Sequence, residues 1–385
     1  MKKRIYLDYG ATTPCDPRVV TAMLPFFSKR FGNPSSIHSH GQEASEILDK
    51  AREKIAGYLG AQKSEIIFTS GGTESDNTAI KGVAYAYRKK GNHIITSSIE
   101  HPAVIKSCAS LMDQGFKVTH VPVDKNGIVD VNEIEKAITT ETILISVMHA
   151  NNEVGTIQPI EDIGKIARKY NICFHTDAVQ TFGHIPLEVN KLGVDLLSAS
   201  AHKLYGPKGA GFLYVRKGTR IKPFMDGGGQ EMGKRASTEN VPGIVGLAKA
   251  SEIAFGEIKE ETERLRHLQQ KMVQGISERL QDVGLNGPMG KRLPGNINLS
   301  VRYAEGESVV MHLDQEGISC STGSACSSSE HEPSHVLKAM GVPDDLARSS
   351  VRFSLGRFTT EEDVNFVIDK LSEAVNKLRA ISPCY

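Results

Sequence analysis

The sequence lacks an excess of charge of either sign. Its 385 residues include 46 lysines and arginines against 45 aspartates and glutamates, for a formal net charge of +1. A chain this balanced has no field that would draw it to nucleic acid or to anionic lipid. It also has no apolar run near the ~20 residues of a membrane span, and its first residues contain no apolar signal-peptide core. We therefore expect a soluble, cytoplasmic protein that binds neither nucleic acid nor a membrane.

Cysteine is sparse, and its spacing is uninformative for metals. The six cysteines form no C-x-x-C pair, which argues against a structural zinc site and against a thioredoxin-like redox motif. In a reducing compartment most of them should be free thiols that pack as small hydrophobes. The glycine-rich turns are not followed by G-K-[ST], so a P-loop nucleotidase is excluded as well.

What the chain does contain is a long alternation of strand-like and helix-like segments. The apolar, strand-like segments are residues 65–70, 93–98, 117–123, 142–150, 172–178, 195–200 and 211–215. Stretches with helical spacing, such as 77–91 and 160–171, lie between several of them. This pattern predicts an α/β fold with a mostly parallel seven-stranded sheet, covered on both faces. Ligands of such sheets bind beyond the carboxyl ends of the strands.

A smaller α+β unit should follow. Residues 261–284 predict a long amphipathic helix that stops at Gly284, then come strands at 296–301 and 351–356 and a closing helix. We accordingly divide the chain into three parts. Residues 1–15 form an N-terminal arm that belongs with the small domain, 16–255 form a large cofactor-binding domain, and 256–385 form the small α+β domain.

Polar residues gather where the predicted strands end. Gly71 and Gly72 close one strand, and Thr73, Ser75 and Asp76 are candidate caps for the helix that follows. The exposed amides of such a helix N-terminus would suit a phosphate. This signal is weak alone, because many strand-to-helix turns look like it.

The next strand ends add histidine, amide and carboxylate groups. His101 follows one strand, where a lone histidine is more often a satisfied polar group than a catalyst. Asn152 follows another, and Asp177 and Gln180 follow a third. Asp177 lies in an apolar run, where an unpaired carboxylate would cost several kcal/mol. It is either half of a structural salt bridge or the partner of a ligand nitrogen that must stay protonated.

Lys203 stands at the end of the strand at 195–200, within SASAHKLYGPKG. Alone it would be read as a surface or salt-bridge lysine. Pyridoxal phosphate requires a lysine, a buried carboxylate and a phosphate-binding site at neighbouring strand ends. Because the sequence offers all three, we interpret Lys203 as a cofactor-binding lysine and not as a surface one. Ser200 and His202 are close enough in sequence to reach the phosphate.

Ordered blocks along nearly the whole chain support this reading. They are YLDYGATTP, FGNPSSIHSHG, GGTESDN, NNEVGT, TDAVQ, AHKLYGPKG, GSAC and VRFSLGRFT. Together they resemble the cysteine desulfurases of the NifS/IscS type, within class V of the fold-type I pyridoxal phosphate enzymes. The resemblance implies a homodimeric enzyme that converts L-cysteine to L-alanine. It passes the sulfur on as a persulfide, for the synthesis of iron–sulfur clusters or other sulfur-containing biomolecules.

The resemblance also implies a role for each candidate site residue. Lys203 is the Schiff-base lysine, with Asp177 on the ring nitrogen, Gln180 on the ring hydroxyl and His101 stacked on the ring. The remaining cofactor-binding residues are Thr73, Asn152, Ser200, His202 and, reaching over from the partner subunit, Thr238. Arg352 is the residue that binds the substrate carboxylate, with Arg357 as a weaker candidate for that task.

Cys326 is the expected carrier of the persulfide. Its Ser/Gly-rich surroundings predict a mobile loop, which suits a nucleophile that must visit both cofactor and acceptor. It is also a candidate for a transient iron–sulfur ligand, whereas Cys320 should be structural. The length of this loop fits NifS- and IscS-type members and not the short-loop SufS type.

Two departures from the family pattern concern a partner and a cofactor contact. The expected partner is an iron–sulfur scaffold protein or another sulfur acceptor, yet the sequence ends without the extension that IscS-type members use to dock the scaffold. The block after Glu74 often reads S-N-N in the family and here has Asp76 in its middle, which could slightly alter cofactor affinity.

Two other functions remain open from sequence. Another class-V enzyme, an aminotransferase or a selenocysteine lyase, could share the lysine and the aspartate, but transamination needs no loop cysteine. A sulfur- or iron-binding carrier without turnover would use its cysteines as ligands, which their spacing does not favour.

Overall fold

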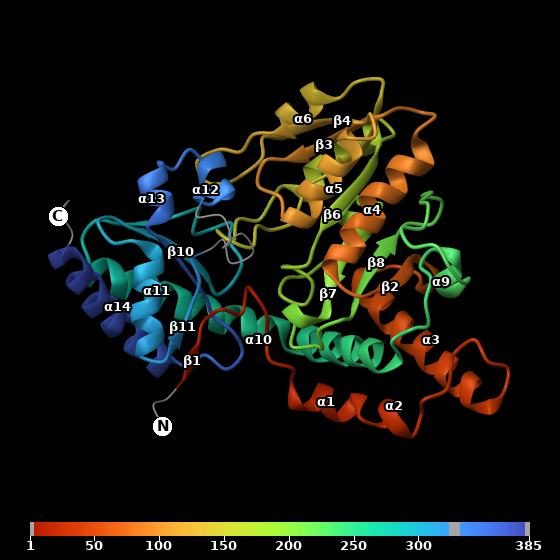
Figure 1. Ribbon diagram of the computed structural model, residues 1–385, viewed down its shortest axis with the longest axis horizontal. Coiled ribbons are helices and arrows are strands. Elements are labelled where there is room, and N and C mark those ends of the chain that lie inside the picture. Colours follow the sequence, from red (N-terminus) through yellow and green to blue (C-terminus); the bar gives the residue numbers. More distant parts are fainter. Residues whose placement is uncertain (1–3, 323–331, 382–385) are drawn as a thin grey trace.

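The structure is a computed structural model that describes residues 4–322 and 332–381. It has a larger part built on a seven-stranded sheet and a smaller part built on a three-stranded sheet. The two parts lie side by side, and the first strand, β1 (Ile5–Tyr6), and the last helix, α14 (Glu361–Ile381), both belong to the smaller one (Figure 1).

All of the strands predicted between residues 65 and 215 form, and they join in one sheet. They are β2 (Ile66–Thr69), β3 (His93–Ser97), β4 (Lys117–Val121), β5 (Thr142–Ser146), β6 (Cys173–Asp177), β7 (Leu196–Ser200) and β8 (Gly211–Val215). Their order is β2-β8-β7-β6-β5-β3-β4. β8 runs antiparallel to both of its neighbours, β2 and β7, and the other neighbouring pairs are parallel. The prediction of a mostly parallel seven-stranded α/β sheet is therefore confirmed.

Helices cover both faces of this sheet because successive strand residues point to opposite sides. Ile67 and Leu213 pack in one core cluster with α4 (Gly72–Tyr87) and α5 (Pro102–Met112). Ile66 and Phe212, their neighbours in sequence, pack on the other side with α3 (Ser39–Leu59) and α7 (Ile160–Lys169). The remaining short helices of this part are α1 (Pro17–Met23), α2 (Pro25–Ser28), α6 (Val131–Ala137), α8 (Val189–Leu192), α9 (Gln230–Gly233), η1 (Lys63–Glu65) and η2 (Ala201–Lys203).

The smaller part joins the two ends of the chain. Its antiparallel sheet has the order β12-β10-β9, and a separate two-stranded sheet pairs β1 in parallel with β11. The strands are β1 (Ile5–Tyr6), β9 (Val283–Leu285), β10 (Asn296–Val301), β11 (Ile318–Ser319) and β12 (Ser350–Ser354). The helices are α11 (Gly306–Gln315), α12 (His335–Ala339), α13 (Asp344–Arg348) and α14 (Glu361–Ile381).

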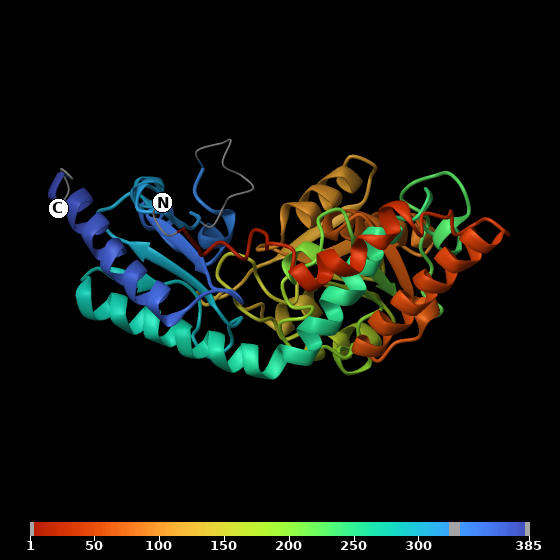
Figure 2. The same cartoon turned by 90° about the horizontal axis from the view of Figure 1, so that it is seen from below.

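One helix, α10 (Val241–Arg279), belongs to both parts. It has 39 residues, and its N-cap is Asn240, whose side chain accepts the amide of Gly243. Leu247 and other residues of its first half pack in the core of the larger part, whereas Leu268 and Met272 pack in the core of the smaller one. Figure 2 shows α10, in teal, running beneath both parts.

The bounds of α10 bear on two expectations from the sequence. The domain boundary expected between residues 255 and 256 falls inside α10. The expected stop at Gly284 is wrong, because α10 ends at Arg279 and Gly284 lies in β9. In the described part of the chain, none of the helices combines the length and apolar character needed to cross a bilayer.

Candidate active site

The polar residues at the strand ends converge on one cavity. It encloses about 300 Å³ of solvent-accessible space beyond the carboxyl ends of the sheet strands. Among the predicted site residues that the structure describes, all except Thr238 line it. These lining residues are Thr73, His101, Asn152, Asp177, Gln180, Ser200, His202, Lys203 and Arg352.

The N-terminus of α4 forms one wall of the cavity, and two glycines allow it to lie there. Gly71 has φ +152°, a conformation that L side chains rarely adopt. A Cβ on Gly72 would stand 2.6 Å from Cγ2 of Val179, so α4 could not start so close to the end of β6. The partial positive charge of a helix N-terminus thus faces the cavity beside Thr73.

The expected side-chain caps of α4 are not seen. Gly71 is the N-cap, and it makes no side-chain cap bond. Ser75 lies within the helix, where its hydroxyl contacts Thr69 Oγ1 at 2.8 Å and donates to the carbonyl of Phe212 at 3.0 Å. Asp76 is also inside the helix and lines the cavity.

Asp177 ends β6 as a buried carboxyl, 6% exposed. Its Oδ1 accepts the amide of Val179 at 2.8 Å, the N–H partner that a buried carboxylate needs. Burial raises its pKa, while His101, the Val179 amide and Lys203 act in the opposite direction. The site therefore surrounds this carboxyl with groups that favour its charged form.

Both the side chain and the backbone carbonyl of Lys203 make hydrogen bonds. Its Nζ donates to the carbonyls of Gly10 and Ala11, at 2.5 and 2.7 Å. Its own carbonyl lies 2.9 Å from Nε2 of His184, and since a carbonyl can only accept, Nε2 must carry the proton. The N-terminal arm thus takes part in placing the lysine.

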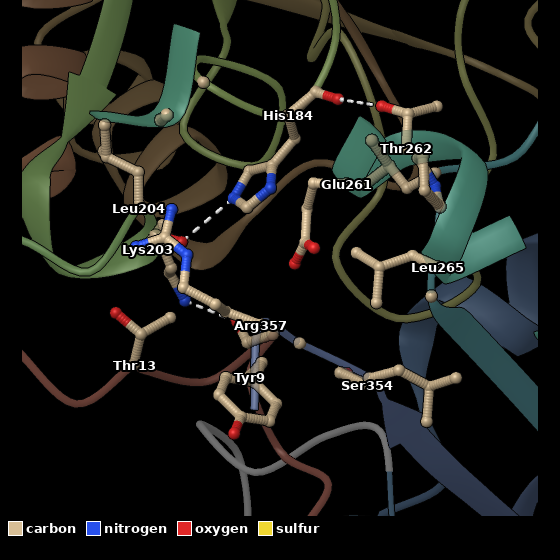
Figure 3. A pocket seen from close by; sticks show the side chains of 18 of the residues that line it. Tyr9, Thr13, His184, Lys203, Leu204, Glu261, Thr262, Leu265, Ser354 and Arg357 are labelled. Carbon is tan, nitrogen blue, oxygen red and sulfur yellow. Dashed lines mark hydrogen bonds between the residues drawn. The ribbon is translucent and has the colours of Figure 1, made fainter. Parts of the chain in front are cut away.

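Figure 3 shows the smaller cavity of about 60 Å³ that shares Gly10, Gln180 and Lys203 with the main one. Arg357, the weaker candidate for the substrate carboxylate, lines this smaller cavity and not the main one. Its guanidinium pairs with Asp16 at 2.8 Å and lies 4.3 Å from the centre of the Tyr205 ring.

His101 is fixed as the N-cap of α5. Its Nδ1 accepts the amide of Ala103 at 3.1 Å, so in the neutral ring the proton sits on Nε2. Burial lowers the pKa of this imidazole. His101 thus lines the cavity as a neutral ring with one remaining N–H.

Three further side chains come from the turns after β6 and β7. Gln180 Nε2 donates to the carbonyl of Gly10 at 3.1 Å, and Nδ1 of His202 lies 3.1 Å from the hydroxyl of Thr12. Burial lowers the pKa of His202 to about 4, so it is neutral at physiological pH. Ser200 is the last residue of β7, and its side chain lies beside Gly71, the N-cap of α4.

Arg352 brings the smaller part of the protein to the cavity. It lies on β12, and its side chain is 3% exposed. Nη1 donates to the carbonyl of Asn152 at 3.1 Å and Nη2 to Asp8 at 2.7 Å. These contacts orient a guanidinium at the edge of the cavity, where it can bind a carboxylate.

Sequence reasoning gave no protonation role to several titratable groups in and behind the cavity, and it named Asp76 only as a candidate cap and a departure from the family pattern. Asp76, Glu153 and His335 line it. Glu100, directly before His101, is fully buried; its Oε1 accepts the amide of Met148 at 3.0 Å and the hydroxyl of Ser97. Burial raises the pKa of Glu100 to about 8. In the sequence, Glu100 could have been noticed as a carboxylate directly before His101, a candidate catalytic residue, at the end of an apolar strand.

One predicted residue that the structure describes does not line the cavity. Thr238 is exposed on the surface of this subunit. Cys326 falls outside the described residues, as does the loop around it. Cys320 is described, and burial raises the pKa of its thiol to about 12, which makes it a poor nucleophile at neutral pH.

Known proteins share this architecture and sequence. The class-V aminotransferase family profile matches residues 5–367. The chain is 58% identical over 383 residues to the cysteine desulfurase IscS of Dictyoglomus turgidum, covering 100% of this chain and 97% of that protein. It is 54% identical over 381 residues to the cysteine desulfurase IscS of Methanosarcina thermophila, covering 99% and 94%.

Solved structures agree. A NifS-like protein superposes with a TM-score of 0.92 at 43% identity, over 97% of this chain and 100% of that chain. A structure described as SspA in complex with cysteine gives a TM-score of 0.83 at 39% identity, over 93% and 100%.

Proposed function

The chain belongs to the class-V aminotransferase family and, within it, to the pyridoxal phosphate-dependent cysteine desulfurases. From this premise we propose that the cavity around Lys203 is where the enzyme removes sulfur from L-cysteine. One observation carries the proposal: a lysine, a buried carboxyl and a helix N-terminus from three separate elements line the same cavity.

The residues present fit pyridoxal phosphate. The glycines at the start of α4 leave backbone amides open to an anion, with Thr73, Ser200 and His202 around them. Asp177 is a buried carboxyl suited to a protonated ring nitrogen. Thr73, Ser200 and His202 would hold the phosphate, Asp177 and Gln180 the ring, and Lys203 would bind the cofactor covalently. When bound, the cofactor supplies a sink for the electron pair left at Cα of the substrate.

Lys203 is then the base of the reaction. Its Nζ would take the Cα proton of L-cysteine, a step that requires a neutral amine in a desolvated site. The carbonyls of Gly10 and Ala11 hold Nζ in position. His101, a neutral ring with its proton on Nε2, would lie against the cofactor face and move a proton between substrate and site.

Arg352 sets the orientation of the substrate. A planar guanidinium can hold the α-carboxylate through two parallel hydrogen bonds, which a lysine cannot. The carbonyl of Asn152 belongs to the larger part of the protein and Asp8 to the N-terminal arm, and both already hold this side chain. Binding of the carboxylate would therefore link substrate to the junction between the two parts.

Cys326 is proposed as the sulfur acceptor. Its thiolate attacks the substrate sulfur, an S–S bond forms as the Cβ–S bond breaks, and the bonding pair stays with the carbon fragment. Protonation of that fragment gives L-alanine, so L-cysteine plus the Cys326 thiol becomes L-alanine plus a Cys326 persulfide. We propose that the persulfide then serves an iron–sulfur scaffold or another sulfur acceptor, with Cys326 as a transient cluster ligand, in the cytoplasm.

The active unit is proposed to be a homodimer. Large apolar side chains lie exposed along the α1–α3 region: Leu24 at 59%, Phe27 at 63%, Phe31 at 66% and Ile37 at 93%. Exposed apolar residues gathered on one segment are typical of a surface that another chain covers. A second copy could cover them while its own Thr238, which this subunit keeps away from its own cavity, reaches the phosphate.

We propose that the larger part is the cofactor-binding domain and the smaller part carries the sulfur-accepting loop. The arm at residues 1–15 goes with the smaller part through the pairing of β1 with β11. Because α10 packs in both cores, the division is one of function more than of folding.

A single-turnover reaction with 35S-labelled L-cysteine tests the role of the loop. Cys326→Ser should keep the fold and the bound cofactor but form alanine at least about 100-fold more slowly, because a hydroxyl is a far weaker nucleophile than a thiolate. Cys320→Ser is the matched control and should form alanine near the wild-type rate, since that thiol is protonated at neutral pH. Mass spectrometry of the trypsin-digested protein should place the label on Cys326.

The same reaction separates the rival functions. A keto acid in place of alanine would point to an aminotransferase, and a strong preference for selenocysteine to a lyase. Protein without a cofactor absorbance band would be a carrier. Label on Cys320 or Cys384, or wild-type alanine formation by Cys326→Ser, would remove Cys326 from the reaction.

A further inference from the structure

Asp76 is a second buried carboxyl in the cavity. It lies one turn into α4 and is 1% exposed. Its Oδ1 has no hydrogen-bond partner within residues 4–322 and 332–381. In the same described part of the chain no lysine or arginine pairs with it, and the charge partner nearest to it is Nε2 of His175, 3.6 Å away.

His175 cannot supply a positive charge to this carboxyl. Its Nδ1 lies 2.9 Å from the hydroxyl of Ser146 and its Nε2 3.0 Å from that of Ser198. The ring is fully buried on β6, and burial lowers its pKa to about 3. Asp76 therefore faces a neutral imidazole and the hydroxyl of Ser198.

The charged groups that act on Asp76 are negative or potentially negative. They are Asp177, from the same strand as His175, and Glu100, from the turn before α5. On its own helix Glu74 is already paired with Arg235 at 2.8 Å. Burial and the repulsion from Asp177 raise the pKa of Asp76 well above its usual range, although Ser198 lowers it in part.

Two buried carboxyls that line one cavity and repel each other cannot both be ionised without a cost. Asp177 has the amide of Val179 and the side chain of Lys203 to favour its charge. Among the described residues the partners of Asp76 are neutral, so of the two carboxyls it is Asp76 that holds the proton.

We propose that Asp76 is a positioning residue that acts as an uncharged carboxylic acid, so that Asp177 is the sole negative charge presented to the cofactor ring nitrogen. The proposal rests on the cofactor role given to Asp177 above. A second negative charge at this place would compete for the ring proton and repel the phosphate end of the cofactor. An uncharged acid keeps the shape and polarity of the site without that competition.

The sign of the pH dependence follows. The folded-state pKa of Asp76 is raised, so the folded protein holds a proton that the unfolded chain has lost above its own ordinary pKa. The stability that Asp76 contributes is thus present at low pH and is lost as pH rises through the folded-state pKa.

The test replaces Asp76 by an uncharged residue of the same shape. Asp76→Asn should bind pyridoxal phosphate within about threefold of wild type at pH 7, whereas Asp177→Asn should bind at least about tenfold more weakly. Asp76→Ala should fall between them, because it loses the shape and hydrogen bonds but not a charge. Equal losses in Asp76→Asn and Asp177→Asn would show that Asp76 works as an anion and would overturn the proposal.

A measurement on the cofactor-free protein keeps this inference separate from the proposed function. The infrared spectrum at pH 7 should contain protonated-carboxyl carbonyl bands from both Asp76 and Glu100. Asp76→Asn should lack the Asp76 band and keep the other, whereas Asp113→Asn, at an exposed site, should retain both. Bands that are both unchanged in Asp76→Asn would overturn the proposal even if cofactor binding behaved as expected. Failure of wild-type protein to bind pyridoxal phosphate would instead overturn the proposed function.

Discussion

Among individual side chains, Glu100 should make stability depend on pH in the neutral range. Its pKa is about 8 in the folded protein, against an ordinary value of 4.5. Between those two values the folded state holds one proton more than the unfolded state, so the free energy of unfolding falls as pH rises, by up to about 1.4 kcal/mol per pH unit. Glu100→Gln keeps an acceptor for Ser97 and Met148 and cannot ionise. We expect the variant to lose less stability than wild type between pH 5 and 8.

Urea unfolding followed by circular dichroism across this pH range measures the effect. Glu141→Gln, at an exposed position, is the control and should follow the wild-type curve. Parallel curves for wild type and Glu100→Gln would mean that Glu100 is ionised in the folded protein.

The sequence predicts which side chains meet in the site but not their protonation. Asp177, Gln180 and Lys203 stand at strand ends, and parallel strands bring such ends to one edge, so their meeting follows from pattern alone. The pKa values of Asp76 and Glu100 are raised chiefly by burial, and they are lowered in part by Ser198 and Met148, which lie far away in the chain. The burial of these two carboxyls depends on tertiary packing, and the hydrophobic periodicity of the sequence does not predict it.

Among the secondary-structure elements, the start of α4 is the most constrained. Gly72→Ala would place a Cβ 2.6 Å from Cγ2 of Val179. The helix end must then move away from β6, which withdraws its amides from the cavity. We expect affinity for pyridoxal phosphate to fall by at least about tenfold, with a stability loss of about 1–3 kcal/mol.

Gly256→Ala is the matched control for this change. Gly256 lies inside α10, and a Cβ there meets nothing within 4 Å. Alanine should therefore stabilise the helix by up to about 1 kcal/mol and leave cofactor affinity unaltered. Calorimetry and cofactor titration check both variants, and equal affinities for Gly72→Ala and wild type would show that the helix start can shift without consequence.

Element boundaries were harder to predict than element types. The seven sheet strands are short apolar runs bounded by turn residues, and all seven form. The extent of α10 was missed because its first half, with Pro242, Gly243 and Gly246, is apolar on too many sides to show an amphipathic stripe. The strand order was not predicted. It depends on which crossover connections pack best, and it produces no periodic pattern in the sequence.

For the whole molecule, a site shared between subunits predicts that two inactive variants regain activity when they form a mixed dimer. Homodimers of Lys203→Ala and of Thr238→Ala each have two defective sites. If Thr238 serves the partner's cavity, a mixed dimer has one site with both defects and one with neither. We expect such a dimer, purified through two affinity tags, to recover about half of wild-type desulfurase activity.

The control mixes Lys203→Ala with Gln180→Ala. Both side chains line the cavity of their own subunit, so every site in that mixed dimer keeps one defect and activity should stay low. Absence of recovery in the Lys203 and Thr238 mixture would place Thr238 outside the partner's site.

The pairing of β1 with β11 has a consequence for how the protein is made. Residues 5 and 6 leave the ribosome first, yet their partners Ile318 and Ser319 are synthesised more than 300 residues later. At ~5–20 residues per second, the arm waits on the order of tens of seconds for its strand partner. That arm supplies the Gly10 and Ala11 carbonyls that hold Lys203. The strand pairing that holds the start of this arm therefore forms only late in translation. Arg352 is also synthesised late, so a nascent chain cannot present a complete catalytic centre before its C-terminal third exists.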